Sequence, residues 1–240
     1  MEGVEFVKER PDLMILIDCL TLRVDVDIRP VFIYGRYRKL SRGIPQTRWP
    51  CRSCRGRSEG CEACEGTGLQ YPDSVQDLIG EPFRLVLSAE NTSFHGMGRE
   101  DIDVRCLGRG RPFVLEVKHP RVRRTDLEEV MKVVNSNGAD KIEISDLRWT
   151  NRSEVSRVKE TRAEKSYTIR FSVEEQPEES FIIESISKLS GVTLEQQTPK
   201  RVSHRRADLI RKRKVVSIDN VVVEDSEVQF SVRCEAGTYA

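Results

Sequence analysis

The sequence predicts an α+β fold in which the sheet is mixed and mainly antiparallel, with a small cysteine-rich region toward the N-terminus. Apolar and polar residues alternate in several segments, among them 22–28 and 228–234, as they do in strands with one buried face. Other segments carry apolar residues at helical spacing, and they are interspersed with the strands without the strict alternation of a parallel α/β sheet. Four closely spaced cysteines are the third observation.

Length and charge limit the classes of function. The chain has 240 residues, enough for one sizeable core or two smaller ones. Charged residues make up 33% of the chain, yet they nearly cancel to a formal net charge of +1. Any affinity for nucleic acid must therefore come from clusters of basic residues. Because the sequence shows neither a signal-peptide pattern nor an apolar run that would span a bilayer, we expect a soluble, cytoplasmic protein without a membrane partner.

The N-terminal segments predict two paired strands followed by a basic connector. Residues 14–17 form an apolar run, and residues 22–28 alternate. Residues 34–49 then mix arginine and lysine with tyrosine and tryptophan. Cationic side chains bind phosphate and aromatic rings stack on bases, so this mixture indicates a connector that contacts RNA. A solvated linker has the same composition, and both interpretations stay open.

Cys51, Cys54, Cys61 and Cys64 give the most specific local signal. They form two Cys-x-x-Cys pairs, and the glycines around them let the backbone turn so that four thiolates converge. Zinc binds four such ligands in a tetrahedron, and a segment with almost no apolar side chains needs a metal to hold its shape. We therefore expect a structural zinc site. A redox dithiol is the alternative, which is disfavoured since no βαβ pattern surrounds a single pair.

The middle of the chain predicts a helix and two strands. Asp73 and Ser74 cap a short helix that Gly80 ends. Residues 83–87 alternate as a strand, and residues 112–117 are strand-like again, so the stretch between them is a loop that joins two strands.

The segments that follow predict one more helix and one more strand. Thr125 is the expected N-cap of this helix, with Glu128 three residues later, and residues 137–138 end it. A strand starts at Ile142, and a polar segment runs from it through Arg162.

The C-terminal third predicts a strand, a helix and a hairpin. Residues 167–173 alternate, which places the Tyr167 ring on the buried face. Residues 200–214 are intensely basic, and 215–223 and 228–234 alternate as strands. The helix runs over 179–189, and its expected inward residues are Phe181, Ile182, Ile186 and Leu189.

The stretch Ser93–Pro112 carries the chemical argument. Glycines flank a segment in which Asp101 and Asp103 lie among arginines. This is how a reactive carboxylate would be kept ionised near a polyanion. A solvated loop with local ion pairs has the same composition.

Three functions are compatible with these residues. In the first, one aspartate attacks a substrate covalently while arginines orient an anionic group. In the second, an aspartate joins Glu116 and Lys118 to bind magnesium and activate water, as in some nucleases. In the third, the chain is a non-catalytic RNA-binding module with a zinc knuckle. Only the first two predict turnover.

Four ordered blocks then indicate a family. GRYRKLSRGIPQTRWPCRSC, FHGMGREDIDVRCLGRGRPFVLEV, QQTPKRVSHRRADL and CEAGTY resemble the archaeal tRNA pseudouridine synthases of the Pus-ten type, which modify the TΨC arm. The resemblance implies a pseudouridine synthase core of two α+β halves. It also implies a THUMP-containing accessory domain before the core and a four-cysteine zinc site.

The resemblance also implies the chemistry. Arg99-Glu100-Asp101 matches the family's Arg-x-Asp loop, which makes Asp101 the expected nucleophile and Asp103 the fallback. Tyr167 matches the active-site tyrosine, and the reaction needs no cofactor. The expected partner is tRNA, and the expected RNA-binding residues are Arg36, Arg38, Arg42, Arg99, Arg105, Arg109, Arg111, Arg201, His204, Arg205 and Arg206.

The resemblance divides the chain into three parts. Residues 1–48 match the end of a THUMP-like domain and a basic connector, residues 49–70 the zinc knuckle, and residues 71–240 the catalytic domain. Family members continue past the match with a strand and a helix that supply a basic partner for the aspartate. We therefore expect most of the THUMP domain and the C-terminal end to be missing, and a second chain or missing segment to complete the catalytic domain.

Overall fold

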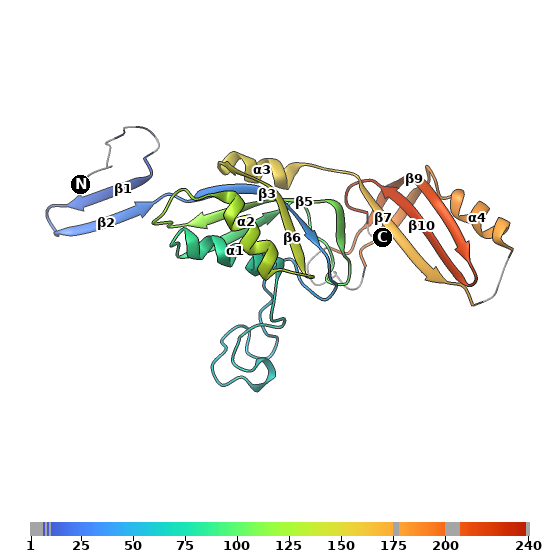
Figure 1. Cartoon of the computed structure of the whole chain (residues 1–240), viewed down its shortest axis with the longest axis horizontal. Coiled ribbons are helices and arrows are strands. Elements are labelled where there is room, and N and C mark those ends of the chain that lie inside the picture. Colours follow the sequence, from blue (N-terminus) through green and yellow to red (C-terminus); the bar gives the residue numbers. More distant parts are fainter. Residues whose placement is uncertain (1–6, 8, 10, 175–177, 200–206, 239–240) are drawn as a thin grey trace. The chain divides into compact units, whose positions relative to one another are not determined.

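The structure, a computed structural model, describes residues 7, 9, 11–174, 178–199 and 207–238. They fall into two compact units, residues 1–161 and residues 162–240, each with its own four-stranded sheet (Figure 1). Every strand pairing among these described residues is antiparallel. The predicted α+β class with mainly antiparallel sheets is therefore confirmed.

The first unit has a sheet in the order β4-β5-β3-β6 with helices on both faces (Figure 1). Neighbouring strand residues face opposite sides, so Ile33 packs into the core with α1 and α2, whereas Phe32 packs against Val158 of α3. The elements are β3 Val31–Lys39, α1 Val75–Val86, β4 Asn91–Gly96, β5 Cys106–Lys118, α2 Leu127–Asn137, β6 Ile142–Thr150 and α3 Arg152–Glu160.

The first part of the predicted basic connector lies inside this sheet. Residues 31–39 form β3, which pairs with β5 on one side and β6 on the other. Tyr37 is fully buried, and the edge of its ring meets Phe94 and Phe113. The strand is hard to recognise in the sequence, because residues 31–34 are apolar on both faces and a lysine, Lys39, occupies a buried position.

The sequence prediction for residues 75–87 was wrong. One helix, α1, continues through Gly80 and Pro82 to Val86, where the sequence predicted a helix end and a strand. Val75, Ile79 and Phe83 are all fully buried at helical spacing. Position 80 requires glycine, because α1 lies so close to β4 that a Cβ there would come within 2.5 Å of Thr92 Oγ1. Ser74 caps this helix by accepting from the Asp77 N–H, as predicted.

Two further helix predictions needed correction. Asp126, not Thr125, is the N-cap of α2, and its carboxylate accepts from the N–H groups of Glu128 and Glu129. The polar segment before Arg162 contains α3, which the sequence did not reveal. Only Val155 and Val158 of α3 face the sheet, which is too few for a clear periodicity.

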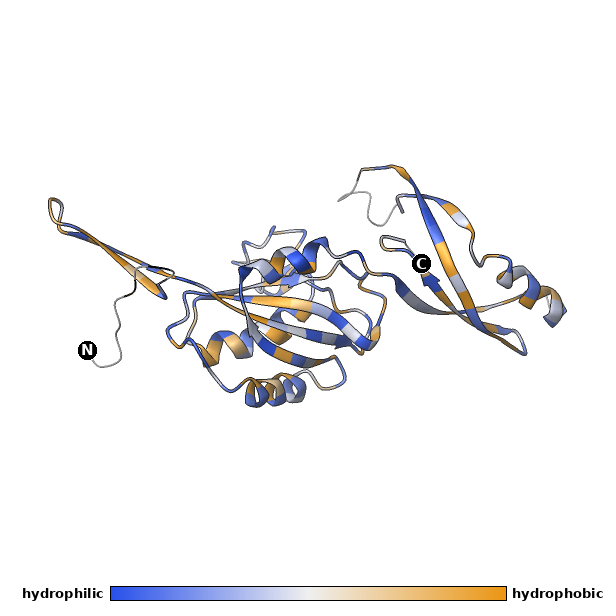
Figure 2. Ribbon diagram, turned by 90° about the horizontal axis from the view of Figure 1, so that it is seen from above, coloured by the Kyte–Doolittle hydropathy of each residue, from blue (hydrophilic) through white to orange (hydrophobic). Residues whose placement is uncertain are grey.

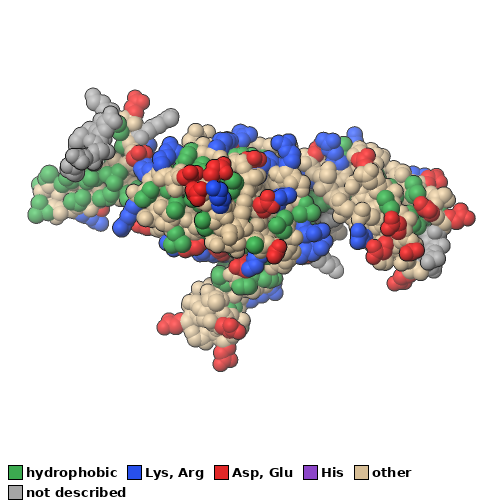
Figure 3. Space-filling model, viewed as in Figure 1, with side chains coloured by type: hydrophobic (Ala, Val, Ile, Leu, Met, Phe, Trp, Pro, Cys, Tyr) green, Lys and Arg blue, Asp and Glu red, His purple; other side chains and the backbone are tan. Residues whose placement is uncertain are grey.

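Two small elements extend from the sheet of the first unit. The strands β1 Leu13–Asp18 and β2 Arg23–Ile28 pair as predicted, and hydrophobic side chains cover this hairpin (Figure 3). The knuckle, residues 49–70, projects on a stem closed by a bridge between Pro50 and Leu69 (Figure 1). Its only helical turn is η1 Glu62–Cys64.

The second unit has a sheet in the order β7-β10-β9-β8, packed against one helix. Tyr167 and Ile169 contact the core residues Phe230 and Val232, so the predicted buried face of this strand is confirmed. The elements are β7 Lys165–Ser172, α4 Glu179–Ser187, β8 Thr193–Gln197, β9 Ile210–Glu224 and β10 Glu227–Cys234. The short strand β8 was not predicted.

The inward face of α4 is narrower than the sequence predicted. Ile182 and Ile186 pack into the core, but Phe181 is 63% exposed and Leu189 is 40% exposed. This helix ends at Ser187, so Leu189 lies beyond it, and within the helix Ile182 and Ile186 are the expected residues that reach the core. Apolar and polar residues alternate along the strands of both units (Figure 2). Among the described residues, no helix has the length and apolar character that crossing a membrane requires.

Candidate functional site

The loop between β4 and β5, residues 97–105, contains both candidate aspartates. The sequence predicted a longer loop, Ser93–Pro112, but both ends of that stretch belong to the strands. Gly110 of β5 has a φ of +70°, and a Cβ there would come within 2.7 Å of the Tyr37 carbonyl oxygen. This glycine therefore allows β5 to approach β3 closely beside the loop.

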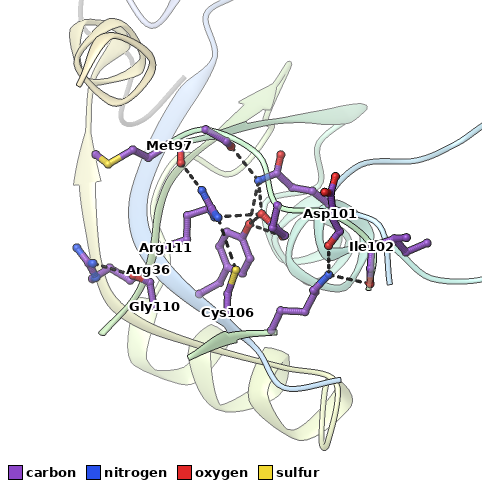
Figure 4. Close-up of polar contacts among 12 residues, drawn as sticks. Arg36, Met97, Asp101, Ile102, Cys106, Gly110 and Arg111 are labelled. Atoms are coloured by element: carbon purple, nitrogen blue, oxygen red, sulfur yellow. Dashed lines mark hydrogen bonds and ion pairs between the residues drawn. The ribbon is translucent and has the colours of Figure 1, made fainter. Parts of the chain in front are cut away.

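The side chain of Glu100 is buried beneath the loop, with 1% of its surface exposed. Its carboxylate accepts hydrogen bonds from the Tyr37 hydroxyl at 2.8 Å and from Gln46 Nε2 at 3.0 Å. Its Oε2 also lies 3.0 Å from Nε of Arg111, a residue labelled in Figure 4. Burying a carboxylate is costly unless it is paired and hydrogen-bonded, and here the Tyr37 and Gln46 hydrogen bonds and the ion pair with Arg111 satisfy it.

Burial also sets the protonation of the groups around Glu100. It raises the pKa of Tyr37 well above its usual range, and the negative charge of Glu100 raises it further, so the hydroxyl stays a donor. Burial raises the pKa of Cys106 as well, which keeps this thiol neutral. Burial lowers the pKa of Lys39, whereas the charge of Glu100 acts in the opposite direction.

Lys39 holds the loop through its backbone carbonyl oxygens. This lysine is fully buried. Its ammonium donates to the carbonyl oxygens of Asp101 at 3.0 Å and Ile102 at 3.2 Å (Figure 4). It also donates to the carbonyl oxygen of Ile44 at 3.0 Å. The last residue of β3 therefore fixes the backbone at the candidate nucleophile.

Further donors hold the loop through its backbone carbonyl oxygens. These contacts are Arg111 Nη1 to Met97 at 2.7 Å, Gln46 Nε2 to Gly98 at 3.1 Å, Gly43 N to Ile102 at 2.8 Å and Arg42 Nε to Asp103 at 2.8 Å. The donors come from β3, from the segment just after it and from β5. We call residues 97–105 the anchored loop.

Anchoring by backbone carbonyl oxygens leaves several charged side chains of the loop accessible. Asp101 is half-buried, whereas Asp103, Arg99 and Arg105 are exposed. Figure 4 shows the Asp101 carboxylate directed away from the carbonyl oxygen that Lys39 holds. The anchored loop therefore presents a carboxylate between exposed guanidinium groups on a fixed backbone, an arrangement suited to an anionic substrate.

Most of the predicted RNA-binding arginines near β3 also contact protein groups. Arg36 donates to the carbonyl oxygens of Arg109 at 2.6 Å and Gly110 at 2.7 Å, and Arg38 forms an ion pair with Glu143. The Arg109 side chain is exposed. An RNA-binding role for these arginines, and for Arg42 and Arg111, stays a prediction.

Glu116, which the nuclease reading needs, has a partner within the sheet. Its Oε2 lies 2.9 Å from His95 Nε2 on the neighbouring strand β4. Both residues lie on the face of the sheet that includes Val114 and α3.

The remaining predicted residues lie elsewhere. Tyr167 is in β7 of the second unit, where it is half-buried against the core. Arg201, His204, Arg205 and Arg206 lie outside the described residues.

Sequence reasoning missed the residues that hold the loop. Tyr37, Lys39 and Gln46 lie in or just after the predicted connector, and Glu100 was considered only as the middle of a motif. One signal was available, because alternation along 33–39 would place Tyr37 and Lys39 on the same buried face. Nothing in the sequence shows that a buried lysine would find carbonyl partners so distant in the chain.

The four cysteines of the knuckle converge. Their Sγ atoms all lie within 4.8 Å of one another, so they can hold one metal ion. Cys51 and Cys64 are buried, and the Gly68 N–H donates to the Cys64 sulfur at 3.2 Å. The pKa of Cys54 is lowered to about 6, because the Ser58 N–H and other backbone donors point at its sulfur.

Comparison with known proteins gives consistent matches. The family described as Pus10, C-terminal, matches residues 32–240. A tRNA pseudouridine synthase Pus10 from Methanothrix thermoacetophila is 47% identical over 231 residues, which cover 95% of this chain and 50% of that protein. The protein of the same name from Methanocaldococcus jannaschii is 44% identical, with 97% of this chain and 50% of that protein covered.

The chain thus spans about half the length of the curated relatives it matches. Among solved structures, a chain of a Cbf5-Nop10-Gar1 complex matches with a TM-score of 0.39 and 20% identity, covering 69% of this chain and 37% of that one.

Replacing Lys39 by methionine tests the anchoring of the loop. Because this change removes the charged donor that three carbonyl oxygens share, we expect the free energy of unfolding to fall by about 1–3 kcal/mol. We also expect faster proteolytic cleavage within residues 97–105. Urea unfolding and limited proteolysis measure the two effects. Lys132→Met removes an exposed lysine paired only with Glu129 and is the control, with an expected change below about 0.5 kcal/mol. Equal effects of the two substitutions would contradict the anchoring role.

Proposed function

The chain belongs to the family described as Pus10, C-terminal, and from this premise we propose that it carries the catalytic machinery of a tRNA pseudouridine synthase. Its substrate would be a uridine in the TΨC loop of tRNA. The observation that carries the proposal is the anchored loop, which presents Asp101 within the family's Arg-x-Asp motif. Its backbone is held by side-chain donors from β3, from the segment after β3 and from β5.

The proposed reaction rearranges one nucleotide without a cofactor. The uridine is flipped out of its stack, because the glycosidic bond is out of reach while the base is stacked. The Asp101 carboxylate assists cleavage of the bond between N1 and C1′. The uracil rotates, C5 bonds to C1′, and the proton that C5 carried is lost while N1 is protonated, so the product is an isomer of the substrate.

Other residues have supporting roles in this proposal. Tyr167 would stack on the uracil and help to remove the C5 proton. Arg99, Arg105 and Arg109 would bind phosphate groups, and their side chains are exposed. The residues 201–206 predicted for RNA binding would extend this surface. We place the protein in the cytoplasm with tRNA as its partner.

The proposed domain division follows the predicted one, with one change. We propose that the catalytic domain, predicted as residues 71–240, also includes β3, since this strand lies in the centre of its sheet. Residues 49–70 would then be a zinc knuckle inserted after that strand, and the hairpin β1–β2 the end of a THUMP-like accessory domain.

The knuckle fits zinc best. Zinc–sulfur bonds of about 2.3 Å in a tetrahedron place sulfur atoms roughly 3.8 Å apart. Cys54 and Cys64 have their sulfur atoms 3.8 Å apart, and an all-thiolate site leaves no open position for a substrate. Zinc would hold Cys51, Cys54, Cys61 and Cys64 and would stabilise the knuckle without taking part in the isomerisation.

The first test is the identity of the catalytic aspartate. We expect Asp101→Asn to lower the release of tritium from C5-labelled uridine in tRNA by about 10³-fold or more, because the amide cannot attack. Asp103→Asn should cost less than about tenfold. The wild-type chain and both variants are assayed alone and as chimaeras in which the chain replaces the matching half of the Methanothrix thermoacetophila relative.

Two outcomes of this assay would count against the proposal. If Asp103→Asn is inactive and Asp101→Asn is not, the assignment is off by one carboxylate. If both variants keep full activity, the mechanism is wrong. The alternatives, a magnesium-dependent nuclease and a non-catalytic RNA-binding module, have no support among the relatives. A nuclease would shorten the RNA and stop in EDTA, whereas isomerisation should leave its length unchanged and continue while the protein retains its zinc.

The metal assignment predicts one equivalent of zinc per chain, measured by inductively coupled plasma mass spectrometry. Cys54→Ser removes one of four ligands, and the protein should lose most of this zinc. Cys106→Ser, which alters a half-buried cysteine outside the cluster, is the matched control and should keep it. Retention of a full equivalent by Cys54→Ser would overturn the four-thiolate site.

A further inference from the structure

Charges are separated along the knuckle. Three arginines come first along the knuckle and three glutamates follow them, all of them exposed. Figure 3 shows acidic side chains at the end of the knuckle farthest from the sheet. The arginines are Arg52, Arg55 and Arg57, and the glutamates are Glu59, Glu62 and Glu65.

The knuckle arginines differ in their contacts from the arginines that lie in or next to the sheet, around the anchored loop. Arg36, Arg42 and Arg111 each donate to backbone carbonyl oxygens around the anchored loop. Among the residues that the structure describes, no protein hydrogen bond or ion pair engages the guanidinium groups of the three knuckle arginines. These three cations are therefore available to a ligand.

The backbone that carries these arginines is held in a fixed turn. Arg55 has a φ of +53°, and its N–H donates to the Cys51 carbonyl oxygen at 2.8 Å. The Arg57 N–H donates to the Cys54 carbonyl oxygen at 3.1 Å. Because both acceptors are carbonyls of the cysteines that would hold zinc, the metal would order the backbone that carries the arginines before any ligand binds. Such preorganisation lowers the entropy cost of binding.

The knuckle is linked to the anchored loop through a segment that both share. The segment that holds the loop, residues 39–46, leads into the knuckle stem, where Trp49 packs edge-on against Tyr71 at 5.6 Å between ring centroids. The loop and the knuckle therefore share one support within the first unit (Figure 1).

We propose that Arg52, Arg55 and Arg57 bind phosphodiester groups of the RNA substrate. Three guanidinium groups on a short rigid turn suit a run of backbone phosphates, and nothing in the turn offers an apolar pocket for a base. This contact does not depend on the RNA sequence, and it adds affinity at a place other than the uridine bound at Asp101. The identification of this RNA as tRNA rests on the proposed function.

A triple substitution tests the proposal. Arg52→Ala/Arg55→Ala/Arg57→Ala is compared with Glu59→Gln/Glu62→Gln/Glu65→Gln, which alters the same number of charges in the same knuckle. The dissociation constant for tRNA is measured by filter binding over a range of salt concentrations, and zinc is measured in each protein. We expect the arginine variant to bind more weakly and the slope of log K against log salt to fall by about 2–3. The glutamate variant should keep the slope of the wild type.

Other results would overturn the proposal. If the arginine variant keeps both affinity and slope, or if the wild type shows no salt-dependent binding of tRNA, these arginines are not phosphate ligands. If the arginine variant loses zinc and RNA affinity in parallel, the arginines serve only to offset the charge of the thiolate cluster.

The isomerisation assay separates this proposal from the proposed function. Suppose that the arginine variant loses RNA binding, and that neither the wild-type chain nor its chimaera isomerises uridine. This result would support the phosphate contact and contradict the proposed enzymatic function. If both proposals hold, the arginine variant should show a raised KM for tRNA with kcat unchanged, since the arginines bind substrate and transition state equally.

Discussion

The ion pair between Glu100 and Arg111 is the interaction on which the candidate site depends. It lies inside the first unit, and Tyr37 and Gln46 complete it with hydrogen bonds. Buried ion pairs seldom add much stability, because the cost of removing two charges from water offsets their attraction. Here the pair holds Glu100, the residue next to Asp101, inside the protein. Its contribution is therefore to fix the geometry of the loop rather than to add stability.

Much of the fold was predictable because local patterns agreed with the tertiary structure. Residues 167–173 and 228–234 alternate and form neighbouring strands, and the cysteine spacing predicted the four converging thiols that could hold a metal ion. Helix α1 was not predictable, because Gly80 and Pro82 oppose helix locally and only the close approach to β4 explains the glycine. The roles of Lys39 and Glu100 were hidden for a similar reason, since their partners lie about sixty positions away in the chain.

Basic residues have two separate uses in the first unit. Those of β3 and the segment after it mostly contact carbonyl oxygens and carboxylates, and so build the site. Those of the knuckle and of the anchored loop, such as Arg52 and Arg99, are exposed. Composition alone cannot separate these uses, because a run of arginines has the same sequence whether it faces carbonyl groups or phosphates.

A double-mutant cycle tests the central claim most directly. The value of kcat for tritium release is measured in Glu100→Gln, Arg111→Met and the double variant, with thermal unfolding as a check on folding. If the buried pair positions Asp101, each single substitution should lower kcat strongly. The kcat of the double variant should then be at least about tenfold higher than the value obtained by multiplying the two single effects. Multiplicative effects, or single variants with wild-type kcat, would contradict the account.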